Sequence, residues 1–130
     1  MAFLAKLTID DGDELNVLNC SYRFTQGTDA TGKPTSIPQG GYVSLVVEST
    51  KATDLFDWMI NPTGTKNGIV TFYRREMESK LKTLEFTDAY CIDYQEDFDH
   101  KGEHPMQISF TVSAKTIKVN DSQFKNNWPE

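Results

Sequence analysis

Apolar and polar residues alternate along most of this chain with a period of two, which is typical of β-strands that bury one face. In the first such segment, one face holds Phe3, Ala5, Leu7 and Ile9. In the second, residues 15–24, one face holds Leu18, Cys20, Tyr22 and Phe24. The third, Tyr42–Glu48, is a nearly continuous apolar run, so it predicts a strand that is buried on both faces.

Four more strands are predicted at residues 69–75, 80–86, 89–98 and 106–114, the last extending as far as Val119. Residues 76–79 join the first two as a hairpin. In residues 89–98, one face is predicted to hold Tyr90, Ile92 and Tyr94, and the other Asp93 and Gln95. In residues 106–114, the inward positions are Met106, Ile108, Phe110 and Val112. Residues 120–130 are predicted to form a polar tail.

One short helix is predicted at residues 54–60. Thr53 is placed to cap its first turn, and acidic residues near its start suit the helix dipole. Its apolar stripe is formed by Leu55, Phe56, Met59 and Ile60. The helix ends at Asn61, because a residue before proline disfavours helical geometry.

These elements predict a mainly β protein, a compact antiparallel β-barrel or sandwich with one short side helix and a long extended loop. Helices do not alternate with the strands, so a long parallel sheet is not expected. The 130 residues fit one domain, residues 1–130, and suffice for one hydrophobic core.

The long loop comprises residues 25–41 and reads TQGTDATGKPTSIPQGG. It is rich in Gly, Thr and Pro and has neither the helical nor the strand period. Loops longer than about 12–15 residues are usually functional or disordered. We therefore expect this loop to lack local structure on its own and to become ordered when it contacts a partner.

The charge balance argues against two classes of partner. The net charge is −6, with 13 basic and 19 acidic residues, so the basic face that a nucleic-acid partner needs is not expected. The lysines are scattered, which argues against a polybasic membrane anchor.

The N-terminal residues lack the apolar stretch of a signal peptide, so we expect the chain to fold in the cytoplasm. Cys20 and Cys91 fall in apolar segments and are expected to be free thiols, with a disulfide between them as the alternative.

Three motifs that could carry chemistry fail on inspection. Gly27 to Lys33 has the spacing of a phosphate-binding loop, but Pro34 replaces the hydroxyl residue that binds the metal. Residues 97–108 imitate a calcium loop, but a lysine and an isoleucine stand at ligand positions. His100 and His104 lie in one polar loop, which we interpret as a solvated hairpin tip rather than a metal site. Neither a catalytic residue nor a cofactor or metal is therefore predicted.

Several short stretches resemble a known family in their order along the chain. They are Ala5-Lys6-Leu7, Val17-Leu18-Asn19-Cys20-Ser21-Tyr22, Asp29-Ala30-Thr31-Gly32-Lys33-Pro34, Glu48-Ser49-Thr50, Trp58-Met59, Pro105-Met106 and Asn127-Trp128-Pro129. On these residues the chain resembles the Hcp (haemolysin-coregulated) proteins of type VI secretion systems, particularly the form found in Bacteroidota.

The resemblance implies a β-barrel with a side helix that forms homo-hexameric rings, which stack into a tube. A contractile sheath surrounds the tube and a spike tips it. Contraction ejects both from the cell, and some members carry effector proteins inside the ring. Such a protein is structural and non-enzymatic. It is cytoplasmic when assembled and secreted without a signal peptide.

A ring or stacking interface is predicted at seven residues. They are Asp29, Thr31, Gly32, Lys33 and Pro34 in the long loop and Asp54 and Trp58 in the helix. A heterologous contact between two different patches closes such a ring, and unpaired sheet edges offer one route to it. The alternatives are a phage-like tail tube protein, a small-ligand carrier with a hollow barrel and a hydrolase that uses His100 or His104.

Overall fold

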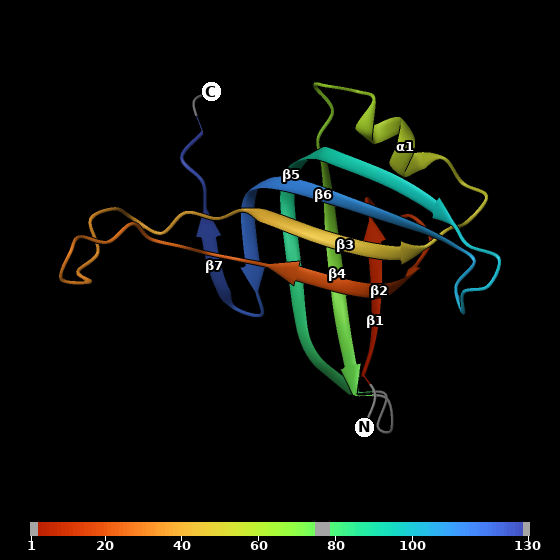
Figure 1. Ribbon diagram of the computed structural model, residues 1–130, viewed down its shortest axis with the longest axis horizontal. Coiled ribbons are helices and arrows are strands. Elements are labelled where there is room, and N and C mark those ends of the chain that lie inside the picture. The colour runs from red at the N-terminus through yellow and green to blue at the C-terminus, as the bar shows by residue number, and fades with distance from the viewer. Residues whose placement is uncertain (1–2, 75–78, 129–130) are drawn as a thin grey trace.

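The computed structural model describes residues 3–74 and 79–128, apart from the side chain of Phe3. Seven strands and one helix lie in this part of the chain (Figure 1). In chain order they are β1 (Phe3–Ile9), β2 (Leu15–Tyr22), β3 (Tyr42–Glu48), α1 (Asp54–Met59), β4 (Lys66–Arg74), β5 (Ser79–Phe98), β6 (Met106–Val119) and β7 (Ser122–Lys125).

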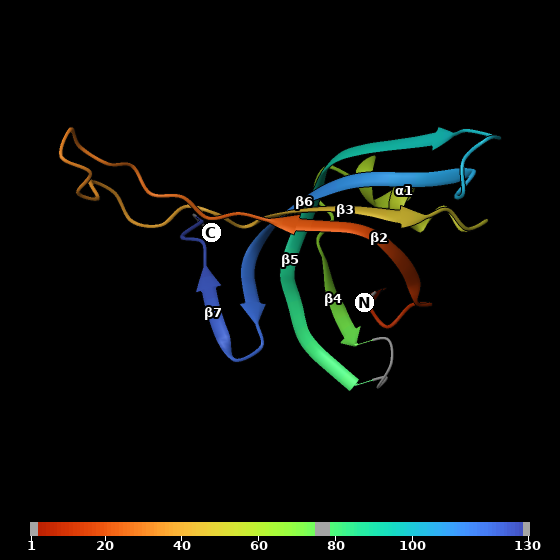
Figure 2. The same ribbon diagram turned by 60° about the horizontal axis from the view of Figure 1, so that its bottom comes forward.

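The strands form one antiparallel sheet that closes on itself. Its order is β3-β2-β1-β4-β5-β6-β7, and β3 also pairs with β6, which completes a barrel of β1 to β6 (Figures 1 and 2). Strand β7 is added outside the closed part, along the end of β6. The predicted antiparallel barrel with one side helix and a long loop is confirmed.

Strand β5 is a single strand of 20 residues, so the prediction of two strands at 80–86 and 89–98 is wrong. Asp88 bends it at φ 52°, and the pairing with β4 shifts register between Lys66 and Gly68. The bend lets β5 belong to two parts of the sheet (Figure 2). Residues 89–98 pair with β6 in the closed barrel, and residues 79–86 pair with β4 in the open sheet below it. Arg75 and the predicted turn lie outside the described residues, apart from Ser79, which begins β5.

The prediction that Tyr90, Ile92 and Tyr94 share a face is also wrong. A register shift between Cys91 and Asp93 interrupts the alternation. Cys91 is buried, Tyr90 and Ile92 are partly exposed on the other face, and Tyr94 packs against the core. The break comes from pairing with β6, which a local pattern does not reveal.

In two further strands, β3 and β2, the side chains that face the core differ from those predicted. In β3 only alternate residues, Val43, Leu45 and Val47, are fully buried, so the expectation of burial on both faces is wrong. In β2 a register shift between Val17 and Asn19 brings Val17 to the core in place of Leu18. This strand ends at Tyr22, two residues earlier than predicted.

Strand β6 reaches Val119, as predicted, and Ile108, Phe110 and Val112 are buried. Met106 is 44% exposed, so its predicted inward position is wrong. The predicted tail is only partly a tail, because four of its residues form β7 and pair with β6. The core sits inside the barrel and is filled by side chains of all six barrel strands and of α1.

Helix α1 packs against β5 at one end of the barrel (Figure 1). The buried helix residues are Leu55 and Trp58, whereas Phe56 and Ile60 are 47% and 62% exposed, so the predicted stripe is wrong. The side chain of Thr53 makes no cap hydrogen bond to the backbone of the first turn, contrary to the prediction. Among the described residues, no helix is long and apolar enough to cross a lipid bilayer.

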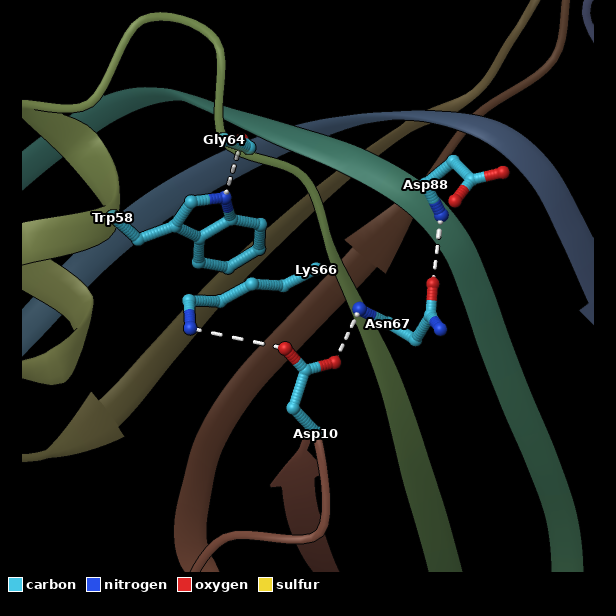
Figure 3. Close-up of polar contacts among 6 residues, drawn as sticks. All are labelled: Asp10, Trp58, Gly64, Lys66, Asn67 and Asp88. Carbon is cyan, nitrogen blue, oxygen red and sulfur yellow. Dashed lines mark hydrogen bonds and ion pairs between the residues drawn. The ribbon is translucent and has the colours of Figure 1, made fainter.

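A polar network ties the end of β1 to β4 and β5 at the bend (Figure 3). The backbone N–H of Asn67 donates to Asp10 Oδ1 at 2.9 Å, and the backbone N–H of Asp10 donates to the Asn67 carbonyl at 2.9 Å. Asn67 Oδ1 accepts from the backbone N–H of Asp88 at 2.9 Å. The Lys66 ammonium lies 3.7 Å from Asp10 Oδ2. These bonds hold Asp10 and Asp88 in their left-handed backbone conformations.

Candidate functional site

The long loop, residues 25–41, is an extended two-limbed arm that projects away from the barrel in both views (Figures 1 and 2). Its limbs are joined by antiparallel bridges between Thr25 and Gln39 and between Thr28 and Pro34. The backbone N–H of Thr35 donates to the Gly27 carbonyl at 2.8 Å. The expectation that this loop lacks local structure on its own is therefore wrong.

The tip of the arm is organised by the carboxylate of Asp29. Its Oδ1 accepts from the backbone N–H of Thr31 at 2.8 Å, the hydroxyl of Thr31 at 2.7 Å and the backbone N–H of Lys33 at 3.1 Å. Gly32 has φ +87°, a conformation that favours glycine. Hydrogen bonds from the Thr31 side chain and backbone, then from Lys33, lower the pKa of Asp29. The turn is therefore built around the charged carboxylate.

Five of the seven predicted interface residues lie together at this tip, and all are exposed. They are Asp29, Thr31, Gly32, Lys33 and Pro34. The same arm carries Ile37, which is 75% exposed and was not among the predicted residues. A large apolar side chain this far exposed on a projecting arm is a candidate for contact with another molecule.

The other two predicted residues, Asp54 and Trp58, lie on α1, away from the arm (Figure 1). Trp58 is 2% exposed. Its ring stacks on Phe86 with 6.5 Å between ring centroids and meets Phe110 edge-on at 6.4 Å. Its Nε1–H donates to the carbonyl of Gly64 at 3.2 Å (Figure 3). Trp58 therefore anchors the helix, and the helix surface open to contact is formed by Phe56, Ile60 and the aspartates.

The loop with the two histidines shows no catalytic arrangement in the part of the chain that the structure describes. His104 Nδ1 lies 3.4 Å from Glu48 Oε1, and His100 is exposed. Within residues 3–74 and 79–128, no group of three or more His, Cys, Asp and Glu could hold a metal ion. Cys20 and Cys91 are free thiols, as expected, and burial raises the pKa of each to about 11.

The barrel interior is packed with side chains rather than hollow. Leu7, Val43 and Val70 are fully buried and belong to the continuous core. A cleft of about 470 Å³ opens at one end of the barrel, with Leu15, Leu55 and Ile108 among its apolar residues and several acidic residues beside them. This arrangement differs from the deep central pocket that a small-ligand carrier needs.

The family profile described as hemolysin coregulated protein Hcp (TssD) matches residues 1–129 of the chain. The chain belongs to the Hcp family. Hcp proteins are the tube subunits of type VI secretion systems, and the resemblance stated from the sequence is confirmed. No curated protein matches the chain.

Solved Hcp structures share this architecture. Hcp1 from Flavobacterium johnsoniae is 41% identical, with a TM-score of 0.90, and the match covers 95% of this chain and 99% of that one. Hcp1 from Salmonella typhimurium is 16% identical, with a TM-score of 0.76 and coverage of 95% and 92%. A chain of the six-fold symmetrised baseplate of the anti-feeding prophage is 13% identical, with a TM-score of 0.54 and coverage of 90% and 91%. The latter two show a common fold alone.

Proposed function

We propose that this Hcp protein is a non-enzymatic subunit of the inner tube of a type VI secretion system. Its residues 1–130 form a single domain. Six copies form a ring, rings stack into a tube, and contraction of a surrounding sheath ejects the tube with its spike. The observation that carries this proposal is the family match over residues 1–129, together with the 41% identity to Flavobacterium johnsoniae Hcp1. Effector proteins would travel inside the ring.

Free sheet edges support ring closure. Among the described residues, β7 pairs only with β6, and Phe3, Leu4 and Ala5 of β1 pair only with β4. Each of these edges therefore offers backbone donors and acceptors to another strand. Two different edges on one subunit suit a head-to-tail contact, which closes into a ring when the rotation between copies allows it.

The arm supports contact between subunits. Its tip is exposed and preorganised by Asp29, so less conformational entropy is lost when it binds than for a disordered loop. We assign the first contact surface to the five tip residues and Ile37. The exposed side of α1, with Asp54 and Phe56, is the second. Trp58 contributes by holding the helix in place.

Deletion of residues 29–35 tests the arm. The shortened protein should keep the barrel fold by circular dichroism but lose ring stacking in negative-stain micrographs, with a lower mass by light scattering. The matched control replaces His100 and His104 with alanine at the other exposed loop and should leave assembly unchanged. Rings and tubes that persist after the deletion would remove the arm from the interface.

Export tests the role of the whole protein. The protein is made and assembled in the cytoplasm, and it reaches the medium by ejection. It should therefore appear in culture supernatant only when the sheath is intact. Equal amounts outside the cell with and without a functional sheath would contradict this proposal.

A further inference from the structure

The end of β7 and the residues that follow it contact the root of the arm, the place where the arm joins the barrel. Phe124, Asn126 and Trp128 are half-buried, whereas Lys125 and Asn127 between them are exposed. The alternation of a strand thus continues past the end of β7, and the inward residues contact other parts of the chain. We call residues 124–128 the C-terminal segment.

The C-terminal segment contacts the chain on both sides of the root. The ring of Phe124 meets edge-on the ring of Phe24, the residue directly before the arm, with 4.8 Å between centroids. Asn126 Nδ2 donates to the carbonyl of Gly40 at 3.1 Å, on the limb that enters β3, and to the carbonyl of Ala114 in β6 at 2.9 Å. Phe24 and Gly40 each neighbour the Thr25–Gln39 bridge, so the contacts lie where the arm leaves the barrel.

Close packing at the root leaves no space for a side chain at Gly40 or Gly41, on the limb that enters β3. Gly41 has φ +103°, and a Cβ there would lie 2.2 Å from Asn126 Nδ2. A Cβ on Gly40 would lie 2.2 Å from the ring of Phe24. Glycine permits both the conformation and the close approach.

Backbone bonds and the terminal tryptophan hold the C-terminal segment itself. The backbone N–H of Asn126 donates to the Lys115 carbonyl at 2.7 Å. Trp128 packs on Tyr90 of β5, with 5.7 Å between ring centroids. The side chain of Asn126 is therefore presented from a fixed position on β6 and β5.

We infer that the C-terminal segment is a clamp that sets the direction of the arm, with the carboxamide of Asn126 as its positioning residue. The described hydrogen bonds of residues 25–39 join one part of the arm to another, so they stiffen the arm without orienting it. Orientation relative to the barrel comes from the root. A carboxamide is suited to this position because its two N–H groups satisfy one carbonyl of the arm and one of β6 together.

The direction of the arm affects the contact between subunits, an effect that rests on the proposed function. A rigid arm on a fixed root meets one surface of a neighbouring subunit, whereas an arm that swings meets it less often and loses more entropy on contact. The direction of the arm is measurable within a single chain, so the clamp is testable apart from assembly.

Spin labels on Ala30→Cys, an exposed tip residue outside the proposed contact surface, and on Lys82→Cys, in a Cys20→Ala/Cys91→Ala background, report the direction of the arm. Labelled protein is mixed with a large excess of unlabelled chains, so that each assembly holds one labelled copy. We expect one narrow distance distribution, which Asn126→Ala broadens several-fold. Asn127→Ala, at the exposed neighbouring position, is the matched control and should leave the distribution narrow. Sedimentation measures the tube yield of Asn126→Ala and Asn127→Ala without the labelling substitutions, and it should fall several-fold with Asn126→Ala alone.

A second variant covers the case in which Asn126→Ala fails to fold. Asn126→Asp keeps the shape but replaces the donor with a carboxylate that faces two carbonyl oxygens, so it should broaden the distribution as well. An unchanged distribution in the folded variants would overturn the clamp. A broadened distribution with a normal yield of tubes would uphold the clamp and count against the arm as an assembly element.

Discussion

At the scale of single residues, the carboxylate of Asp29 decides whether the arm has a defined tip. It accepts three hydrogen bonds from Thr31 and Lys33, although the residue is exposed. Asn at this position keeps an oxygen acceptor and favours the same kind of turn, whereas Ala keeps neither. We expect Asp29→Ala to speed amide exchange at Thr31 and Lys33, and Asp29→Asn to do so less. Equal exchange in both variants and the parent would show that the turn forms without this side chain.

The same carboxylate gives the tip a pH dependence. Its pKa in the folded protein lies below the ordinary value of 3.8, because the hydrogen bonds favour the charged form. The stabilisation is therefore present above pH 3.8 and is lost as the pH falls through the lower pKa of the folded state. Amide chemical shifts of Thr31 and Lys33 should titrate with a midpoint below pH 3.8. A transition centred above pH 4 would contradict this assignment.

The two thiols should be unreactive in the folded protein. With pKa values near 11, roughly one thiolate in a thousand thiols is present at pH 8. A thiol reagent should therefore label native protein slowly and urea-unfolded protein rapidly at both Cys20 and Cys91. Burial of the neutral thiols contributes stability below their unfolded pKa of about 9, and this contribution is lost as the pH rises through 11. Fast labelling of native protein would show that the strands around them open.

At the scale of elements, Trp58 attaches α1 to the barrel. A six-residue helix is marginal alone, so burial of this ring accounts for much of its stability. Trp58→Ala should lower the free energy of unfolding by about 3–5 kcal/mol, as large-to-small core substitutions of aromatic residues do. Phe56→Ala, which removes a half-exposed ring of the same helix, is the control and should cost less. Urea unfolding measures both, and equal losses would contradict the anchoring role of Trp58.

Gly68 of β4 lies directly opposite Phe86 of β5, close to the bend. A Cβ on Gly68 would lie 2.2 Å from the Phe86 ring, so Gly68→Ala forces the ring or the strands to shift. We expect a loss of about 1–3 kcal/mol, the usual cost of overpacking a core. Gly102→Ala is the control, because the nearest atom to a Cβ there lies at 3.5 Å in an exposed loop. Equal thermal stability of the two variants would show that the ring moves aside without cost.

The sequence pattern was a good guide to elements and a poor guide to their irregularities. Alternation located most strands and the arm, because burial on one face is a local property. The bend at Asp88 falls at the predicted break between two strands, since a local pattern does not show that pairing continues across it. The shift at Cys91 depends on partner strands distant in sequence. Asn126 was missed because it acts on backbone carbonyls of other segments, and a lone Asn in a polar stretch carries no sign of that.

At the scale of the whole molecule, β5 and β6 each run through both the closed barrel and the open sheet below it (Figure 2). Neither part can lose its pairing without disturbing the strands of the other. We expect one cooperative unfolding transition. Far-ultraviolet circular dichroism and the fluorescence of Trp58, read in a Trp128→Phe background, should give the same urea midpoint. Separate midpoints would show two units of folding.

The seam between β3 and β6 joins residues 42–48 to residues 107–113, which are far apart along the chain. On the ribosome, β3 emerges before its partner, so the barrel stays open until residues 107–113 have been made. During this interval one edge of β3 is unpaired and its core-facing side chains, Val43, Leu45 and Val47, are incompletely covered, so the strand is prone to aggregation. A truncated product that stops before Met106 therefore lacks the strand that shuts the cylinder, and is expected to be degraded or aggregated rather than to act as a defective building unit.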